Sequence, residues 1–156
     1  MSPKKKTFYI ATSYERKDIA NELAKIVMTE KKELWPIFPW WSFDEEDRYH
    51  KHQGAVGILE IQAAAEADFF VWVYPVRKGG WCELGAACYM HSRDPWRNNV
   101  IMIIPESAED DYLPPFAYQP DVCRVIIPDK TYKNTKKLAA EITRVMSQIE
   151  VDECIL

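Results

Sequence analysis

The stretch ADFFVWVY, residues 67–74, is followed directly by PVRKGGWCELGAA, residues 75–87, and together they decide the fold. The first is an apolar run of strand length, rich in aromatic and β-branched residues. Proline and glycine residues end it, and the spacing then becomes typical of a helix. The order predicts a strand, a loop and a helix, and ligands of open α/β sheets bind at such carboxyl ends of strands.

Glu83 is the acidic residue of this stretch, and we expect it in the first turn of the helix. The helix dipole alone favours an acidic residue there, by about 0.3–1 kcal/mol. However, Glu83 stands among Trp81, Cys82 and Leu84, and a carboxylate in such dry surroundings usually has a partner or a chemical role. Glu83 is therefore a candidate catalytic residue.

Strands and helices alternate along the rest of the chain, which implies parallel strands joined by right-handed crossovers. The sequence predicts a three-layer α/β sandwich with a five-stranded parallel sheet in the flavodoxin-like order 2-1-3-4-5. In that order strands 1 and 3 are neighbours, so Thr12 and Ser13 meet the loop before Glu83. Further strands are expected at 7–11, 34–38, 99–104 and 122–127, a helix through Ile19, Leu23, Ile26 and Val27, and others at 53–66, 80–91 and 135–149.

Length and charge restrict the class of protein. The 156 residues suit a single domain spanning 1–156, and the net charge of −4 argues against a nucleic-acid polymer or an anionic membrane as partner. No apolar stretch approaches the length of about 18 residues that a membrane span needs, and no secretion signal is visible. We therefore expect a cytoplasmic location.

The four cysteines, Cys82, Cys88, Cys123 and Cys154, form no CxxC pair, and only three histidines accompany them. This spacing predicts no metal site, and no cofactor is expected. Cys82 is an alternative nucleophile at the start of a helix, although a free cysteine is more often a small core residue.

The segment 39–52 carries Trp40, Trp41 and Phe43 without the periodicity of a helix or strand. Long irregular loops in compact domains are commonly functional. The rings could stack on a planar ligand or form an interface with another subunit. We take Trp41 as a candidate for substrate binding.

Glu60 interrupts an otherwise apolar face of the predicted helix 53–66, where Val56, Ala63 and Ala67 are its neighbours. A carboxylate in that position needs a partner. It either forms a salt bridge at the edge of the helix or turns toward a pocket.

Arg77 and Lys78 stand beside Gly79 and Gly80 at the predicted N-terminus of a helix. A basic loop in this position suits an anion such as the phosphate of a nucleotide, although exposed basic residues are usually only solvated. A preference for a 5′-phosphate would favour a nucleotide hydrolase over a nucleoside transferase.

Two separated parts of the sequence together resemble the nucleoside 2-deoxyribosyltransferase family. They are FYIATSY at 8–14, and the Ala-Asp pair at 67–68 with its strand and GGWCELGAA at 79–87. The family typically shows a tyrosine or similar residue in strand 1, an Ala-Asp-strand segment, and then Gly-x-x-x-Glu-x-Gly. The resemblance covers roughly residues 7–104 and implies a flavodoxin-like fold.

What the resemblance implies is cleavage of an N-glycosidic bond in a nucleoside or nucleoside 5′-monophosphate. Glu83 matches the glutamate nucleophile, Tyr9 the strand-1 tyrosine that orients it in some members, and Glu60 an acidic residue before strand 3. Arg77 stands where several transferases have an aspartate. Family members often assemble into oligomers that complete each other's sites, so a homo-oligomer is expected.

The chemistry agrees with these roles. Displacement of a base passes through an oxocarbenium-like state, which a carboxylate below the sugar ring can stabilise or attack. A phenol that donates to this carboxylate favours its ionised form, and a second acidic residue can act as general acid or base. The expected catalytic residues are Glu83, Tyr9 and Glu60, and the expected substrate-binding residues are Thr12, Ser13, Arg77, Gly79, Gly80, Trp81 and Trp41.

Two other interpretations stay open. Residues 8–18 and 81–84 also resemble parts of TIR domains, some of which cleave NAD with a glutamate, but here the glutamate directly follows the cysteine. The other alternative is not an enzyme: it is a nucleotide-binding or protein-interaction module that keeps the pocket but does not turn over a substrate.

Overall fold

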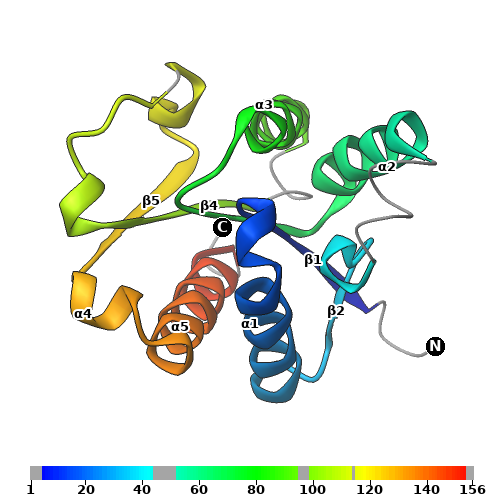
Figure 1. Ribbon diagram of the computed structural model, residues 1–156. Coiled ribbons are helices and arrows are strands. Elements are labelled where there is room, and N and C mark those ends of the chain that lie inside the picture. Colours follow the sequence, from blue (N-terminus) through cyan, green and yellow to red (C-terminus); the bar gives the residue numbers. More distant parts are fainter. Residues whose placement is uncertain (1–4, 44–51, 95–98, 114, 154–156) are drawn as a thin grey trace.

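The computed structural model describes residues 5–43, 52–94, 99–113 and 115–153 (Figure 1). Five parallel strands form one sheet in the order β2-β1-β3-β4-β5, which confirms the predicted flavodoxin-like order. The strands are β1 (Lys6–Ala11), β2 (Leu34–Pro36), β3 (Phe69–Val73), β4 (Asn99–Pro105) and β5 (Val122–Ile127).

Helices cover both faces of the sheet. In Figure 1, α2 and α3 lie over one face, and α1 and α5 lie over the other. The central strand β3 is buried along its whole length, as its apolar sequence predicts for a strand covered on both sides. The helices are α1 (Lys17–Glu30), α2 (Gln53–Glu66), α3 (Lys78–Arg93), the short α4 (Asp129–Tyr132) and α5 (Thr135–Glu153).

Strand β2 is shorter than predicted. It ends at Pro36, because Phe38 adopts a left-handed backbone conformation with φ 50° that turns the chain out of the sheet. The 3₁₀ helix η2 (Trp40–Ser42) follows, and the Trp40 indole donates to the carbonyl of Ile10 at 2.7 Å. The segment 39–52, predicted without regular structure, thus contains a 3₁₀ helix at 40–42, and residues 44–51 lie outside the described part.

Helix α3 begins two residues before the predicted start at position 80. Glu83 consequently lies in the second turn of the helix, and the prediction of the first turn is wrong. Lys78 and Gly79, which the sequence placed before the helix, are part of it. Because the dipole effect falls off within the first turn, helix capping does not explain this carboxylate.

The Ala-Asp pair before β3 has a structural role. The carboxylate of Asp68 accepts hydrogen bonds from the backbone N–H and the hydroxyl of Thr7, at 2.7 and 3.1 Å. These bonds fix the start of β3 beside the start of β1. Tyr9 then pairs with Phe70 in the register of the two strands.

The second half of the chain adds α4 and the 3₁₀ helices η4 (Glu106–Ala108) and η5 (Pro115–Tyr118), which the sequence did not predict. Helix α5 extends past the predicted end at 149. No helix in the described ranges is both long and apolar enough to cross a membrane.

Candidate active site

A pocket of about 140 Å³ opens where β1 and β3 end and α3 begins. This is the switch point of the strand order, where open α/β sheets bind their ligands. Eight described residues line it, and the sequence singled out seven of them, all except Tyr14: Thr12, Ser13, Tyr14, Glu60, Arg77, Gly79, Gly80 and Glu83.

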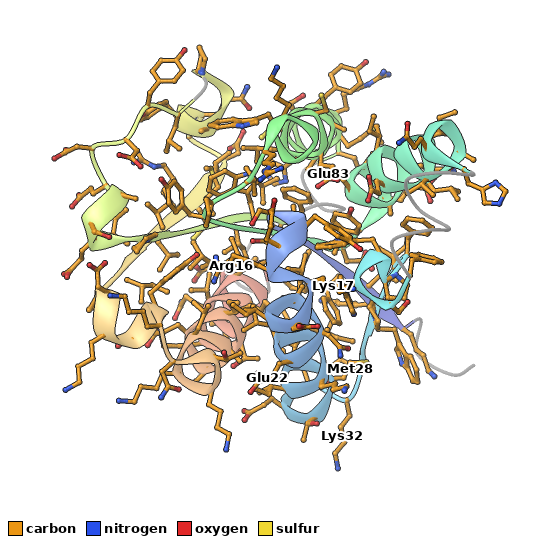
Figure 2. The ribbon with its side chains drawn as sticks, viewed as in Figure 1. Arg16, Lys17, Glu22, Met28, Lys32 and Glu83 are labelled. Atoms are coloured by element: carbon orange, nitrogen blue, oxygen red, sulfur yellow. The ribbon has the colours of Figure 1, made fainter. Side chains whose placement is uncertain are left out.

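Tyr9 and Glu83 form a buried pair at the base of this region. The Tyr9 hydroxyl donates to Oε1 of Glu83 at 3.2 Å, across 74 residues of sequence. Tyr9 is fully buried and Glu83 is 7% exposed. The Tyr9 ring also stacks on Phe70, with centroids 6.0 Å apart, so the phenol has a fixed direction. Figure 2 shows Glu83 on the side of α3 that faces the sheet.

Glu60 reaches the same pocket from a different helix. It stands on α2, which packs beside α3 (Figure 1), and it lines the pocket together with Glu83. Two carboxyl groups from two helices therefore face one small cavity. This is one of the two positions that the sequence allowed for Glu60.

The loops after β1 and β3 are fastened to each other. The backbone N–H of Ser13 donates to the carbonyl of Pro75 at 3.0 Å, and the Thr12 hydroxyl contacts the same oxygen at 3.4 Å. The Tyr74–Pro75 peptide bond is cis. Arg16 donates to the Tyr74 carbonyl from the β1 side. These contacts fix the two halves of the pocket mouth.

A cluster of polar side chains supports the far side of this loop. Arg16 also donates to the Tyr132 hydroxyl at 2.5 Å, and the Tyr74 hydroxyl donates to the carboxylate of Asp111. The bond to Asp111 raises the pKa of Tyr74, and burial raises the pKa of Tyr132 although Arg16 opposes it. The cluster joins four segments that are distant in sequence, so no local pattern predicted it.

Arg77 lies at the rim of the pocket, with 78% of its side chain exposed, and it forms an ion pair with Glu15. An exposed pair of this kind contributes little to stability. Among the described residues that line the pocket, Arg77 is the cationic one, and its guanidinium remains largely exposed in the pair with Glu15.

The two glycines of the first turn of α3 differ in their surroundings. A Cβ atom on Gly80 would lie 2.8 Å from the Cβ of Val76, whereas a Cβ on Gly79 would meet nothing within 4 Å. Gly80 thus permits the close approach of the loop to the helix. Gly79 leaves open space beside the pocket, which both line.

Trp81 and Trp41 do not line this pocket, unlike the other expected substrate-binding residues. Trp81 packs edge to face against Trp72, with centroids 5.9 Å apart. Trp41 is 7% exposed and packs in the same way against Trp40 at 5.8 Å. Both rings pack against neighbouring tryptophans, because large aromatic rings bury much apolar area.

Tyr14 is the lining residue that the sequence reasoning left out of the site. It follows Thr12 and Ser13 directly, and its ring lies 6.4 Å from that of Trp40. Its place at the end of the first strand was the available signal.

The described residues give no support for a metal site or for a catalytic cysteine. No group of three or more His, Cys, Asp or Glu side chains there could hold a metal ion. Cys82 is exposed and does not line the pocket beside Glu83. Cys88 is buried, and this burial raises the pKa of its thiol to about 11, so it is an unreactive core residue.

Comparison with known proteins shows a similarity of fold to one solved structure. No protein-family model matches the chain, and no curated protein sequence matches it. Among solved structures, it is similar to the CMP N-glycosidase BcmB of Clostridium botulinum, with a TM-score of 0.55 and 20% sequence identity. The match covers 88% of this chain and 97% of that one. At this identity, the likeness establishes the shared α/β fold.

Proposed function

We propose that the protein cleaves the N-glycosidic bond of a nucleoside 5′-monophosphate or a (deoxy)nucleoside, with Glu83 as the nucleophile. The observation that carries this proposal is the buried pair of Tyr9 and Glu83 beside a pocket that Glu60 also lines. The name of the structural neighbour, a CMP N-glycosidase, supports the same class of reaction. A cytoplasmic location, a single domain and a homo-oligomer belong to the proposal.

In the first step, a carboxylate oxygen of Glu83 attacks the anomeric carbon of the sugar. The bond from that carbon to the base nitrogen breaks, and the base leaves with the electron pair. Glu60 supplies a proton to the departing base as general acid. The product is free base and a glycosyl ester on Glu83.

In the second step, Glu60 takes a proton from water, and the oxygen of that water attacks the anomeric carbon. The ester bond breaks, Glu83 returns as a carboxylate, and a free sugar or sugar phosphate leaves. If a second base attacks in place of water, the outcome is transfer. Tyr9 is a positioning residue in both steps, since its hydroxyl donates to Oε1 of Glu83 and so directs the carboxylate.

The phosphate of a nucleotide would be bound at the mouth of the pocket. Arg77 is a strong hydrogen-bond donor for such a group, and its side chain is 78% exposed there, in an ion pair with Glu15. Gly79, Thr12 and Ser13 line the same pocket. A nucleoside would lack this interaction, so we expect monophosphates to bind more tightly.

A substrate panel tests the proposal. Purified protein is incubated with nucleosides, their 5′-monophosphates and NAD, and free base is measured by chromatography, with Glu83→Ala as the control. We expect base release from nucleosides or monophosphates that Glu83→Ala abolishes. Base release from NAD alone would favour the TIR-like reading, and binding without release would favour the non-catalytic module.

Trapping the intermediate tests the nucleophile itself. A slow 2-fluoro substrate should leave a glycosyl adduct on the peptide that contains Glu83, detected by mass spectrometry. Fragment ions that place the adduct on Cys82 would overturn the assignment.

A matched pair of variants tests the phosphate. Arg77→Gln should raise the KM for a monophosphate about 10-fold, because a hydrogen bond to a charged group is lost. The KM for the corresponding nucleoside should stay unchanged. Lys78→Gln, next in sequence and outside the pocket lining, is the control. Equal effects of the two variants would show that only the general charge of the loop matters.

A further inference from the structure

Strand β1 loses its neighbour β2 shortly before the candidate active site. The two strands pair as far as Pro36, which lies opposite Phe8, and the backbone N–H of Ile37 then donates to the Phe8 carbonyl at 2.9 Å. Successive donors along one edge of a parallel pair are two residues apart, so residue 39 would donate next, to the carbonyl of Ile10. Residue 39 is a proline and has no N–H.

The side chain of Trp40 takes the place of this missing backbone donor. Its indole N–H donates to the Ile10 carbonyl at 2.7 Å. Ile10 is fully buried and Trp40 is 2% exposed, so bulk water does not reach this carbonyl. Because a buried carbonyl without a donor is destabilising, the indole is needed where β1 approaches the pocket.

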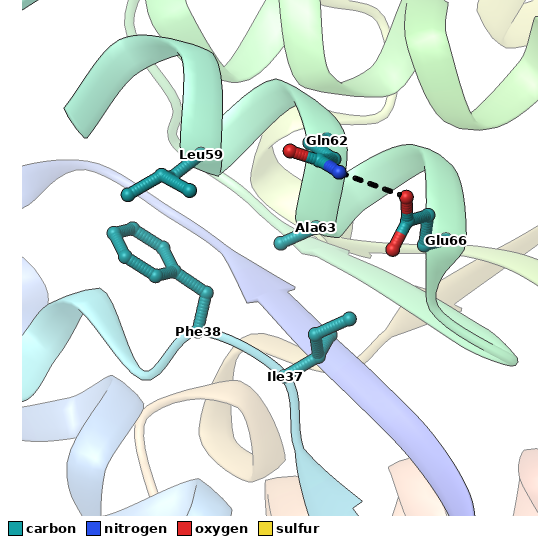
Figure 3. Close-up of a pocket in the computed structure, with 6 residues that line it drawn as sticks. All are labelled: Ile37, Phe38, Leu59, Gln62, Ala63 and Glu66. Carbon is teal, nitrogen blue, oxygen red and sulfur yellow. Dashed lines mark hydrogen bonds between the residues drawn. The ribbon is translucent and has the colours of Figure 1, made fainter. Parts of the chain in front are cut away.

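The turn after β2 brings Trp40 to this position. The backbone of Phe38 is left-handed, with φ 50°, and the chain leaves the sheet there. Figure 3 shows the Phe38 ring facing Leu59 of α2 across a groove of about 220 Å³. On its other side the ring packs against Phe43, with centroids 5.2 Å apart. The chain therefore turns back toward β1, where the indole of Trp40 meets it.

Trp40 contacts both ends of the segment that forms one wall of the pocket. Residues 12–14 line the pocket directly after β1, and we call them the β1 wall. The indole N–H holds Ile10, two residues before this wall. The rings of Trp40 and Tyr14, the last residue of the wall, have centroids 6.4 Å apart. A single buried side chain thus supports the β1 wall from both of its ends.

We propose that Trp40 is a positioning residue for the cleavage of the glycosidic bond. It holds the β1 wall in the place where the sugar attacked by Glu83 would be bound, and it acts through the wall because it does not itself line the pocket. This inference rests on the function proposed above. A displaced wall would weaken the binding of the sugar in nucleosides and monophosphates alike, whereas Arg77 contributes to the phosphate alone.

Steady-state base release by Trp40→Phe, which keeps an aromatic ring but removes the N–H donor, tests the proposal. Cytidine 5′-monophosphate and cytidine are the first pair of substrates. We expect KM to rise about 10-fold for both, with little change in kcat, because the wall binds the sugar and Glu83 carries the chemistry. Trp35→Phe, at a β2 tryptophan that is 48% exposed, should leave both constants unchanged. A higher KM for the monophosphate alone, or equal effects of the two variants, would contradict the proposal.

Hydrogen exchange followed by NMR tests the wall without any reaction. The backbone N–H of Ser13 in the wall donates to the Pro75 carbonyl at 3.0 Å. The reference is the amide of Leu138 in α5, which donates to Asn134 at 2.9 Å. In Trp40→Phe, Ser13 should exchange about 10-fold faster relative to Leu138, and an unchanged ratio would overturn the proposal. If the wild type releases no base from any substrate, the proposed function fails, while this ratio still decides whether Trp40 holds the wall.

A second variant keeps the test decisive if circular dichroism shows that Trp40→Phe does not fold. Benzothienylalanine in place of Trp40 keeps the bicyclic ring and puts sulfur where the indole has its N–H. It should reproduce the higher KM and the faster exchange of Ser13. A folded protein with the KM and the exchange rate of the wild type would show that the bond to Ile10 has no positioning role.

Discussion

In each of the two helical layers, one polar residue of a described helix is buried. The two residues differ in where their hydrogen-bond partners lie. In the layer of α1 and α5, the Thr143 hydroxyl donates to the carbonyls of Ala139 and Ala140 in its own helix. In the layer of α2 and α3, Glu83 accepts from Tyr9, 74 residues away. The first bond is local, whereas the second exists only in the assembled fold and leaves a carboxylate at a pocket.

The two layers also differ in the residues that they expose to solvent. Helices α1 and α5 are tied together by Glu150, whose carboxylate binds Lys31 at 2.8 Å and Lys6 at 3.1 Å. Helix α2 instead leaves Ile58 and Ile61 exposed. The layer of α1 and α5 supports the sheet, while the layer of α2 and α3 holds the candidate site. Variants in the two layers should therefore have different consequences.

The largest expected effect is on catalysis. Glu83→Gln keeps the shape of the side chain but removes the nucleophile, so kcat/KM should fall by at least roughly 1,000-fold. Thr143→Val is the matched change of a buried polar group in the other layer, and activity should be unchanged. Base release at fixed protein concentration measures both. If Glu83→Gln remained active, the claim that only the layer of α2 and α3 carries catalysis would be wrong.

The next effect is on stability. Leu23 is fully buried in α1, and Leu23→Ala should lower the free energy of unfolding by about 2–5 kcal/mol through lost burial and the resulting cavity. Activity per folded molecule should remain that of the wild type. Urea unfolding followed by circular dichroism, with base release measured well below the transition, checks both parts. A loss of activity in folded protein would show that the supporting layer also tunes the pocket.

Tyr9→Phe sharpens the role of the buried pair. The change removes only the hydroxyl and keeps the ring on Phe70, so the carboxylate loses one fixed donor. We expect kcat to fall about 10- to 100-fold with little change in KM, since a hydrogen bond to a charged group contributes about 1.5–3 kcal/mol. Steady-state kinetics give the two constants. A rise in KM alone would assign Tyr9 to substrate binding instead.

The two glycines of α3 provide a smaller, internally controlled effect. Gly80→Ala should cost about 1–3 kcal/mol of stability and raise KM, because its methyl group would meet the Cβ of Val76 and push the loop that carries Arg77. Gly79→Ala has space for the methyl group and should be neutral or slightly stabilising. Thermal unfolding and KM should separate the pair, and equal behaviour would contradict the close approach at Gly80.

The smallest effect concerns Glu150 and depends on pH. Burial favours the protonated form, but the hydrogen bonds and charges of Lys31 and Lys6 outweigh it and lower the pKa below its ordinary value of 4.5. Because the folded pKa is depressed, this stabilisation is present above the unfolded pKa and is lost as the pH falls through the folded one. Glu150→Gln should cost about 1 kcal/mol at pH 7 and progressively less below about pH 4. Denaturant unfolding at several pH values tests this, and a constant difference would contradict it.

Much of the architecture could be predicted from the order of patterns along the chain. The alternation of apolar strands with helical spacings predicted a parallel sheet, and the order 2-1-3-4-5 was confirmed. The range 53–66 was predicted without error for α2. The start of α3 was missed by two residues, because Gly79 is a weak helix former and favoured a boundary after it.

The sequence by itself determined which residue types stand at the carboxyl ends of strands 1 and 3, because the strand order follows from the sequence of elements. Only the tertiary structure decided which side chains meet. It joined Tyr9 to Glu83 and turned Glu60 to the same pocket, while Trp41 and Trp81 pack against other tryptophans. Local spacing predicts the face of an element, but a contact across 74 residues depends on sheet register and helix placement, which the packing of the whole core sets.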